Sequence, residues 1–499
     1  MQTVATGVWI SLAIYFILMI AIGVYAYFKQ KNDVEGYMLG GRNLGPAVTA
    51  LSAGASDMSG WLLLGLPGYM YASGVVSIWI ALGLTIGAFA NYLIVAPRLR
   101  VFTEVADNAI TLPDYFSNRF NDTSHLLRIM SAVVIIVFFT VYTAASLVAG
   151  GKLFESSLGL SYDLGLWVTA GVVVAYTLFG GFLAVSLTDF VQGVIMLIAM
   201  LLVPIVAFTE IGGVSEGMAA AQQVNSEVFN WTNGVTTMGI ISLMAWGFGY
   251  FGQPHIIVRF MAIRSVKDVP VATAIGMGWM ILSLIGALGV GLAGIGYIAK
   301  TGAKLDDPET IFLFFSQVLF HPLISGFLLA AILAAIMSTI SSQLLVVSSS
   351  LTRDVYKLFF NKNATESQQV TVGRISVVAV AIIAVILAGD RNSSVLELVS
   401  HAWAGFGAAF GPLVILSLMW KRMNRNGALA GAIVGALTVI IWVYGKLTIN
   451  GQPANSVIYS ILPGFAFSFI ATIVVSLMTA PPKDFIVARF EEMKKGLKG

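Results

Sequence analysis

The stretch that decides the fold is Gly-Ala-Ser-Asp-Met-Ser-Gly-Trp at residues 54–61, followed by Gly-Leu-Pro-Gly at residues 65–68. It lies inside a long apolar segment. A second apolar segment has the same character, because residues 246–254 read Trp-Gly-Phe-Gly-Tyr-Phe-Gly-Gln-Pro. Unwound backbone at membrane depth survives only where it lines a cavity or is buried in protein. A matched pair of such segments predicts two broken helices around a transporter site. The alternative is that the glycines in both segments serve close helix packing.

The composition places the whole chain in a membrane. Of 499 residues, 58% are hydrophobic and only 10% are charged, and the mean hydropathy is +0.89. A soluble chain carries about 25% charged residues. These values exclude a soluble enzyme, a disordered protein and a nucleic-acid-binding protein, and predict a polytopic protein in a lipid bilayer. The chain has no cysteine, so disulfides and thiolate metal sites are excluded. Separately, the sequence predicts no obligatory protein partner.

A helix needs about 20 apolar residues to cross a bilayer. Thirteen runs meet this length, and the sequence predicts an all-α protein with thirteen transmembrane helices. The first run is interpreted as a span and not as a cleaved signal peptide. The runs are 7–28, 46–72, 75–96, 129–150, 164–182, 190–208, 238–258, 271–298, 322–351, 370–389, 398–419, 427–445 and 457–478.

The basic residues predict the orientation, because cytoplasmic loops carry an excess of Lys and Arg. With thirteen spans, 22 of the 27 basic residues fall on one side. The N-terminus is therefore predicted outside and the C-terminus in the cytoplasm. The five basic residues on the other side are Lys152, Lys300, Lys304, Arg391 and Lys446.

The two interrupted runs are five spans apart. Because five is odd, spans 2–6 and spans 7–11 would lie in opposite orientations, which predicts an inverted five-plus-five repeat. The whole chain 1–499 is then one transport domain. Within it, residues 1–45 hold the first helix and a cytoplasmic loop, 46–212 the first repeat, 236–421 the second repeat, and 422–499 spans 12 and 13 with a cytoplasmic tail that is predicted to form a surface helix.

Two carboxylates fall within the predicted spans, where ionisable groups are costly and indicate function. Asp57 lies in the break of span 2 and could bind a cation, pair with a basic residue or relay a proton. Its structural alternative is a cap on the broken helix. Asp189 lies near the start of span 6. A cap or an interfacial charge explains Asp189 as well as a role in an ion pathway does.

Span 9 offers oxygen ligands on one face. Residues Ala335, Ser338 and Thr339 share that face, and hydroxyl and carbonyl oxygens suit a hard cation. The alternative is that both hydroxyls bond to carbonyls in the preceding turn, as they commonly do in membrane helices.

The remaining patterns are less specific. Trp61, Tyr142, Trp246 and Tyr250 could line a pocket for an amphipathic solute, although aromatic residues in membrane proteins are more often interfacial or packing residues. The four histidines show no zinc-binding spacing. Two Gly-x-Gly-x-x-Gly strings lie inside predicted spans and do not follow a strand, so a nucleotide site is not predicted.

Seven motifs together resemble the sodium/solute symporter family, and within it the bacterial sodium/proline symporters. The resemblance extends from about residue 40 to residue 435. The motifs are GGRNLGP at 40–46, TALSAGASDMSGW at 49–61, LPDYF at 112–116, GGFLAVS at 180–186, GYFGQPH at 249–255, ST at 338–339 and WAGFGAAFGP at 403–412.

The resemblance implies Na⁺-driven proline uptake across the bacterial cytoplasmic membrane, with Na⁺ as the co-transported ion and no other cofactor. It implies one Na⁺ held by the carbonyls of Ala55, Met58 and Ala335 and the hydroxyls of Ser338 and Thr339. It places Asp189 on the inner sodium route. The residues that it implies for proline binding or coupling are Asp57, Ser59, Gly60, Trp61, Gly65, Tyr142, Trp246, Tyr250 and Pro254.

Some alternatives stay open from the sequence. The same fold could carry another solute, such as pantothenate or a sugar acid, or could use H⁺ as the coupling ion. An ion channel would show filter segments and continuous pore helices, which the broken spans oppose. An enzyme would need a nucleophile with a base, or a metal site, and neither pattern is visible. The lack of cysteine departs from bacterial relatives, with Ser342 where a cysteine is familiar.

Overall fold

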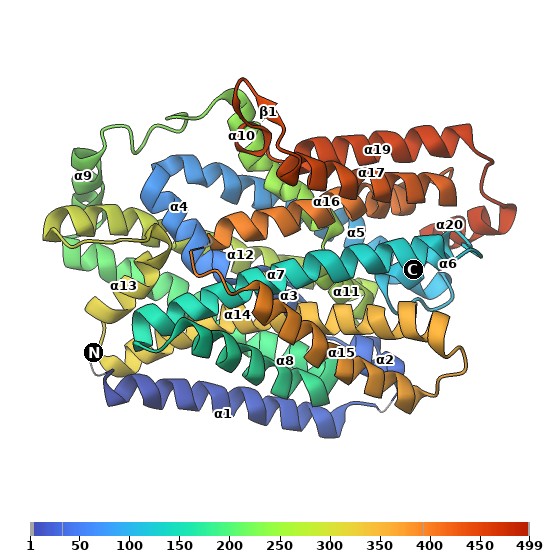
Figure 1. Ribbon diagram of the computed structural model, residues 1–499, viewed down its shortest axis with the longest axis horizontal. Coiled ribbons are helices and arrows are strands. Elements are labelled where there is room, and N and C mark those ends of the chain that lie inside the picture. The colour runs from blue at the N-terminus through green and yellow to red at the C-terminus, as the bar shows by residue number, and fades with distance from the viewer. Residues whose placement is uncertain (1–3, 32, 393, 498–499) are drawn as a thin grey trace.

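The computed structural model describes residues 4–31, 33–392 and 394–497. It is a bundle of helices that run mostly along one axis (Figure 1). Ten helices in the described part are long and apolar enough to cross a membrane. The protein is therefore an α-helical membrane protein, as its composition predicts.

The first half of the chain alternates long helices with short turns. Its elements are α1 (Thr6–Lys29), α2 (Val34–Leu39), η1 (Gly40–Arg42), α3 (Pro46–Asp57), η2 (Trp61–Gly65), α4 (Leu66–Ser73), η3 (Gly74–Ser77), α5 (Ile78–Val105), α6 (Leu112–Arg119), α7 (Leu126–Leu158), α8 (Tyr162–Ile211) and α9 (Val214–Val224).

The second half repeats this character and adds a two-residue antiparallel hairpin in which Ile449 pairs with Gln452. Its elements are α10 (Thr237–Met244), η4 (Ala245–Gly252), α11 (Pro254–Ala262), η5 (Val266–Asp268), α12 (Val269–Thr301), η6 (Pro308–Thr310), α13 (Ile311–Val318), α14 (Pro322–Ser350), η7 (Leu351–Phe360), α15 (Glu366–Leu387), α16 (Val395–Met419), α17 (Arg425–Tyr444), β1 (Thr448–Ile449), β2 (Gln452–Pro453), α18 (Ala454–Val457), α19 (Ile461–Met478) and α20 (Asp484–Gly496).

The predicted span 46–72 is interrupted where its glycines and polar residues predict a break. Helix α3 ends at Asp57, and Met58 leaves the helical region with φ −76° and ψ 75°. The chain resumes as the π-helical turn η2 and then as α4, whose second residue is Pro67. A proline is tolerated there because the first amides of a helix have no partner to lose. The break leaves carbonyls near Asp57 outside any α-helix.

The seventh apolar segment is interrupted in a different way. Eight residues of 3₁₀-helix, η4, join α10 to α11, and Gln253 is extended before Pro254 starts α11. Gly249 faces the indole of Trp403 so closely that a β-carbon would lie 1.9 Å from its Nε1. Only glycine allows this approach, which explains one of the glycines in the segment.

Helix α8 is two helical segments joined at Gly181. This glycine has φ 55° and ψ −149°, which lies outside the helical region. A straight helix of 50 residues would be about 75 Å long, far more than the ~30 Å hydrocarbon core of a bilayer. The fifth and sixth predicted spans therefore meet at Gly181 without a loop.

The buried centre of the bundle is α14, which contacts α1, α3, α7, α8 and α15. Every residue from Leu328 to Leu345 is buried. The outer helices instead expose large apolar residues, such as Ile17 on α1 and Ile386 on α15. A belt of exposed apolar side chains on the outer helices suits a lipid surround.

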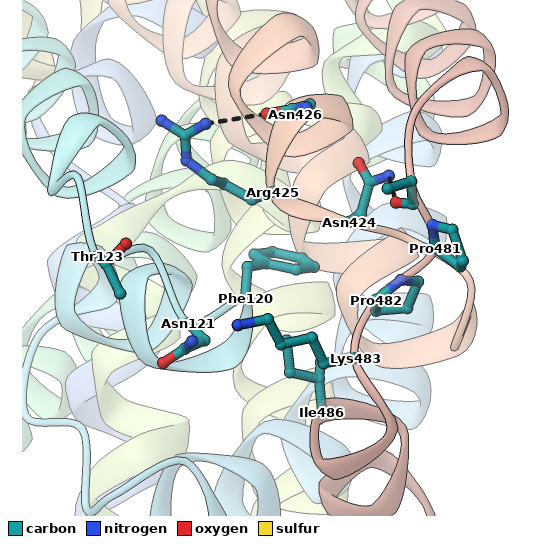
Figure 2. A pocket seen from close by; sticks show the side chains of 11 residues that line it. Phe120, Asn121, Thr123, Asn424, Arg425, Asn426, Pro481, Pro482, Lys483 and Ile486 are labelled. Atoms are coloured by element: carbon teal, nitrogen blue, oxygen red, sulfur yellow. Dashed lines mark hydrogen bonds between the residues drawn. The ribbon is translucent and has the colours of Figure 1, made fainter.

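The C-terminal helix α20 is docked on the bundle and not free in solvent. Its Phe490 ring meets Phe102 of α5 edge-on at 6.0 Å, and Arg489 pairs with Asp107 at 2.7 Å. Beside its start, an open cavity of about 280 Å³ lies between the α6–α7 loop, the start of α17 and residues 480–486, with Arg425 and Lys483 among its lining residues (Figure 2). In Figure 1, α2, α6 and α20 gather at one end of the bundle and α9 and α13 at the other.

Candidate functional site

Four of the five predicted sodium ligands meet between α3 and α14. The Ser338 hydroxyl donates to the carbonyl of Ala55 at 2.6 Å and lies 3.1 Å from the carbonyl of Ala335. The Thr339 hydroxyl also donates to Ala335, at 3.1 Å. All of these residues are fully buried. Two carbonyls and two hydroxyls, each an oxygen suited to a hard cation, therefore converge on one point.

Back-bonding within α14 explains only part of this group. The contacts of Ser338 and Thr339 with Ala335 are the local bonds that hydroxyls make in membrane helices. The contact between Ser338 and Ala55 joins two helices through residues that lie 283 positions apart in the sequence. Met58, the fifth predicted ligand, is buried, but among the described residues its carbonyl makes no hydrogen bond to α14.

Asp57 is held by the two broken segments. The Tyr250 hydroxyl of η4 donates a short hydrogen bond to Asp57 Oδ2. The Trp61 indole donates to the Asp57 main-chain carbonyl at 3.2 Å. Among the described residues, no backbone amide donates to its carboxylate and no basic residue pairs with it. The capping alternative for Asp57 therefore has no hydrogen bond to support it.

An aromatic cluster packs on Tyr250, the partner of this carboxylate, and its members come from η2, η4, α16 and the turn before α19. Trp403 of α16 meets the Tyr250 ring edge-on at 5.1 Å, and its indole donates to the Trp246 carbonyl at 2.8 Å. Trp246 stacks on Tyr459 at 5.3 Å. Trp61 is also buried. The rings therefore pack around the broken segments, and none of the four tryptophan and tyrosine residues predicted for the solute is an exposed interfacial residue.

Tyr142 of α7 adds a polar atom to the same region. It is fully buried, its hydroxyl lies beside the side chain of Ser59, and its ring meets His255 edge-on at 6.0 Å. Ser59 and Gly60 serve the break itself. The Ser59 amide donates to the Asp57 carbonyl at 2.8 Å, and a β-carbon at Gly60 would lie 2.8 Å from Ala149.

Two predicted solute residues lie on opposite sides of the cluster. Gly65 lines an open cavity of about 360 Å³ together with Lys152 and Glu309. Pro254 instead lines a small cavity with Pro113 and Phe182. The structure therefore does not bring Gly65 and Pro254 together with Asp57 in one pocket.

Asp189 forms a buried ion pair and is neither interfacial nor a helix cap. It lies 3.0 Å from Arg259 Nη2, and both side chains are fully buried. Ser52 of α3 donates to Asp189 at 2.8 Å, and Arg259 donates to Ser342 of α14 at 2.6 Å. Three packed helices, α3, α11 and α14, supply the partners of this carboxylate, so Asp189 is not a surface charge of the protein.

The sequence interpretation missed two residues of this region. Arg259 was expected among the charges of a cytoplasmic loop, but α11 extends the seventh span far enough to bury it. The available signal was its place directly after a broken span. Trp403 lies in the motif at 403–412, but the sequence analysis assigns no role to its side chain. The glycine-rich run at 246–252 was the available signal, because glycines leave room for a large ring from a neighbouring helix.

The comparisons with known proteins identify the family. The model of the sodium:solute symporter family matches residues 37–435. The osmoregulated proline transporter OpuE of Bacillus subtilis is 56% identical over 98% of this chain and 98% of its own length. The high-affinity proline transporter PutP of the same organism is 56% identical over 95% and 98%. The sodium/proline symporter 2 of Staphylococcus saprophyticus is 53% identical over 98% and 96%.

Solved structures share the fold at low identity. A Na⁺-coupled sialic acid symporter in a substrate-bound outward-open state is 20% identical, with a TM-score of 0.80 over 96% of this chain and 99% of that one. Mhp1, a nucleobase-cation-symport-1 family transporter in a closed conformation, is 14% identical, with a TM-score of 0.54 over 92% and 98%. The extent of the family match and the identities above 50% decide the matter: the chain belongs to the sodium:solute symporter family.

Proposed function

We propose that this protein is a secondary active transporter that couples inward Na⁺ flow to L-proline uptake by alternating access. The observation that carries this proposal is the convergence of Ala55, Ala335, Ser338 and Thr339 oxygens between a broken helix and the central helix α14. Relatives that carry names of proline transporters, at 53–56% identity over nearly their full lengths, support proline as the solute.

The proposed sodium site uses neutral oxygens. The carbonyls of Ala55, Met58 and Ala335 and the hydroxyls of Ser338 and Thr339 would replace the water ligands of one Na⁺, and each hydroxyl would turn its proton away from the ion. A cation at this point would join α3 to α14. Its binding would therefore fix the position of the broken segment that begins at Met58.

The proposed solute site is the cluster around Asp57. Proline is a zwitterion with a secondary ammonium, a carboxylate and a small apolar ring. The Asp57 carboxylate is the group that would attract the ammonium, since no basic residue of the described chain neutralises it. Trp61, Trp246 and Tyr250 would pack against the ring, and the buried hydroxyl of Tyr142 would donate to the solute carboxylate. Gly65 and Pro254 would line the approaches on either side.

The proposed topology has thirteen crossings. Ten described helices meet the length and apolarity needed for a span. Three predicted spans fall short for physical reasons: the second and seventh are broken into pieces, and Tyr162–Leu178 is shorter and turns at Gly181. Counting these three gives thirteen, with the inverted repeats 46–212 and 236–421 and a single transport domain. The basic residues then favour an outside N-terminus and a cytoplasmic C-terminus in the bacterial cytoplasmic membrane.

The decisive experiment is counterflow of radiolabelled proline in proteoliposomes with and without Na⁺. Exchange that needs Na⁺ and that unlabelled proline inhibits is the expected result. Pantothenate, a sugar acid and an H⁺ gradient serve as comparison arms. Exchange of another solute but not proline, or exchange that follows pH and ignores Na⁺, would replace the proposal with one of its alternatives.

A further inference from the structure

The open cavity of about 280 Å³ beside α20 is not used by the proposed transport function. Its walls are the α6–α7 loop, the start of α17 and residues 480–486, and none of the residues proposed for Na⁺ or proline lines it. Figure 2 shows Asn121 and Thr123 on one wall and Pro481 and Pro482 on the opposite wall. A water molecule takes up ~30 Å³ of liquid, so the cavity has room for a much larger group.

Hydrogen bonds and an ion pair hold the walls of this cavity in place. Asn424 is 7% exposed, and its side-chain oxygen accepts from the Gly427 amide in the first turn of α17. Its side-chain nitrogen donates to the carbonyl of Ala480 at 2.8 Å, which ties α17 to the segment before α20. Arg425 pairs with Asp122 of the α6–α7 loop at 2.8 Å. The cavity is therefore built by three segments that are bonded to one another.

The lining of the cavity is positively charged. Arg425 and Lys483 line it, and none of its lining residues is acidic. Asp122, which is not a lining residue, offsets the charge of Arg425 in part. Lys483 is exposed, and its ammonium forms no ion pair with any residue that the structure describes. Asn121 and Thr123 add an amide and a hydroxyl as hydrogen-bond donors. This set of groups suits an anion of the size of a phosphate ester.

A stripe of exposed apolar residues on α19 leads to the same cavity. Phe467, Ile470, Val474 and Leu477 are spaced by three or four, so they share one face of the helix, and each is between 43% and 59% exposed. Helix α19 has 18 residues and is about 27 Å long, close to the ~30 Å hydrocarbon core of a bilayer. The cavity begins at Ala480, two residues after this helix ends. It therefore lies at the depth where lipid headgroups meet the hydrocarbon core.

We propose that this cavity binds the headgroup of an anionic phospholipid, with Lys483 and Arg425 facing its phosphate and one acyl chain along the apolar stripe of α19. A soluble phosphate compound has the same charged group but would leave the stripe unused, so the two features together favour the lipid. With the topology proposed above, the site faces the cytoplasmic leaflet, where basic residues beside a membrane helix attract anionic headgroups. The lipid would join the α6–α7 loop, α17 and α20 at one point.

The test is native mass spectrometry of the purified full chain in detergent, titrated with phosphatidylglycerol or with phosphatidylcholine. We expect wild type to bind its first phosphatidylglycerol more tightly than its first phosphatidylcholine. Lys483→Gln should weaken the phosphatidylglycerol complex about fivefold, which corresponds to the ~1 kcal/mol that one basic residue near an anionic surface contributes. Lys483→Arg keeps the charge and should bind as wild type does.

The matched control is Lys267→Gln. Lys267 is also an exposed lysine, the thirteen-span topology places it on the same side of the membrane as Lys483, and it does not line the cavity. We expect this variant to bind phosphatidylglycerol as wild type does. An equal loss of affinity in Lys267→Gln and Lys483→Gln would overturn the proposal, because the total charge of the chain would then explain both.

Inorganic phosphate and glycerol phosphate form the last arm of the experiment, and we expect neither to displace the lipid. Displacement by either compound would assign the cavity to a soluble phosphate and would overturn the lipid site. Wild-type protein with equal affinity for the two lipids, or Lys483→Gln with wild-type affinity for phosphatidylglycerol, would overturn it as well. Because no readout involves Na⁺ or proline, each of these failures would leave the proposed transport function unaffected.

Discussion

The hydroxyl of Ser338 donates a hydrogen bond of 2.6 Å to the carbonyl of Ala55, across 283 residues of sequence. This contact links the central helix α14 to the last turn of the first broken helix. It places side-chain oxygens of one proposed repeat against main-chain oxygens of the other. Because the break at Met58 frees main-chain groups from helical bonding, this junction is where a small cation can connect the two halves.

The first prediction concerns these hydroxyls. Ser338→Ala or Thr339→Ala removes one oxygen from the proposed sodium site, and we expect the Na⁺ concentration for half-maximal proline uptake to rise at least about tenfold, which corresponds to ~1.4 kcal/mol. The matched control is Ser349→Ala, because Ser349 lies on the same helix and donates only to Leu345. Titration of uptake against Na⁺ is the measurement, and unchanged titrations for both variants would move the site elsewhere.

The second prediction concerns the carboxylate of Asp57. Asp57→Asn keeps the shape of the side chain and its contact with Tyr250 but removes the negative charge. We expect the variant to reach the membrane and to lose most proline uptake, while Asp57→Glu keeps a small residual activity. Uptake of labelled proline, normalised to protein in the membrane, provides the measurement. Wild-type uptake by Asp57→Asn would reduce Asp57 to a structural residue.

The breaks in the helices were predictable from sequence, and the partners of the buried side chains were not. Glycine, proline and polar residues in an apolar run disrupt helical bonding locally. The residue types at 54–61 and 246–254 therefore predict an interruption of the helix without any knowledge of its neighbours. The pairing of Asp189 with Arg259 depends on how α8 and α11 pack, and no local pattern encodes that distance. Likewise, Ser338 could be placed on a helix face by its spacing, but its contact with Ala55 needed the tertiary structure.

The third prediction concerns the ion pair between Asp189 and Arg259. Removing one partner leaves an uncompensated buried charge, which costs about 3–5 kcal/mol. We therefore expect Asp189→Asn and Arg259→Gln each to lower the melting temperature of the purified protein, and the double variant to be less destabilised than the two effects added. Arg391→Gln breaks an exposed pair with Glu155 and should change little. Strict additivity would show that the pair is not coupled.

The fourth prediction concerns the orientation of the chain in the membrane. The thirteen-span topology places 22 basic residues on one side of the membrane and 5 on the other. A green fluorescent protein fused to the C-terminus should fluoresce, because it folds in the cytoplasm. Alkaline phosphatase at the same position should be inactive, because it needs the periplasm. The reverse pattern would require an even number of spans or an inverted chain.

The last prediction concerns the coupling between Na⁺ and proline. A Na⁺ between α3 and α14 would fix the segment that starts at Met58, and that segment carries Trp61, whose indole bonds to the Asp57 carbonyl. Tyr250, from the other broken span, already contacts the Asp57 carboxylate. Ion binding would therefore order several groups that the solute needs. By thermodynamic linkage, each ligand must tighten the binding of the other by the same factor.

Equilibrium binding in detergent isolates this effect, because no gradient drives it. We expect proline affinity to rise about 5- to 100-fold when Na⁺ replaces K⁺, which matches a coupling free energy of ~1–3 kcal/mol, and Na⁺ affinity to rise equally with proline. The Trp61→Phe variant, which loses the indole N–H but keeps an aromatic ring, should weaken this coupling more than it weakens Na⁺ binding without proline. Proline affinity that is equal in Na⁺ and K⁺ and changes only with pH would show that Na⁺ does not assemble the solute site. A proton at Asp57 would then be the better candidate for the coupling ion.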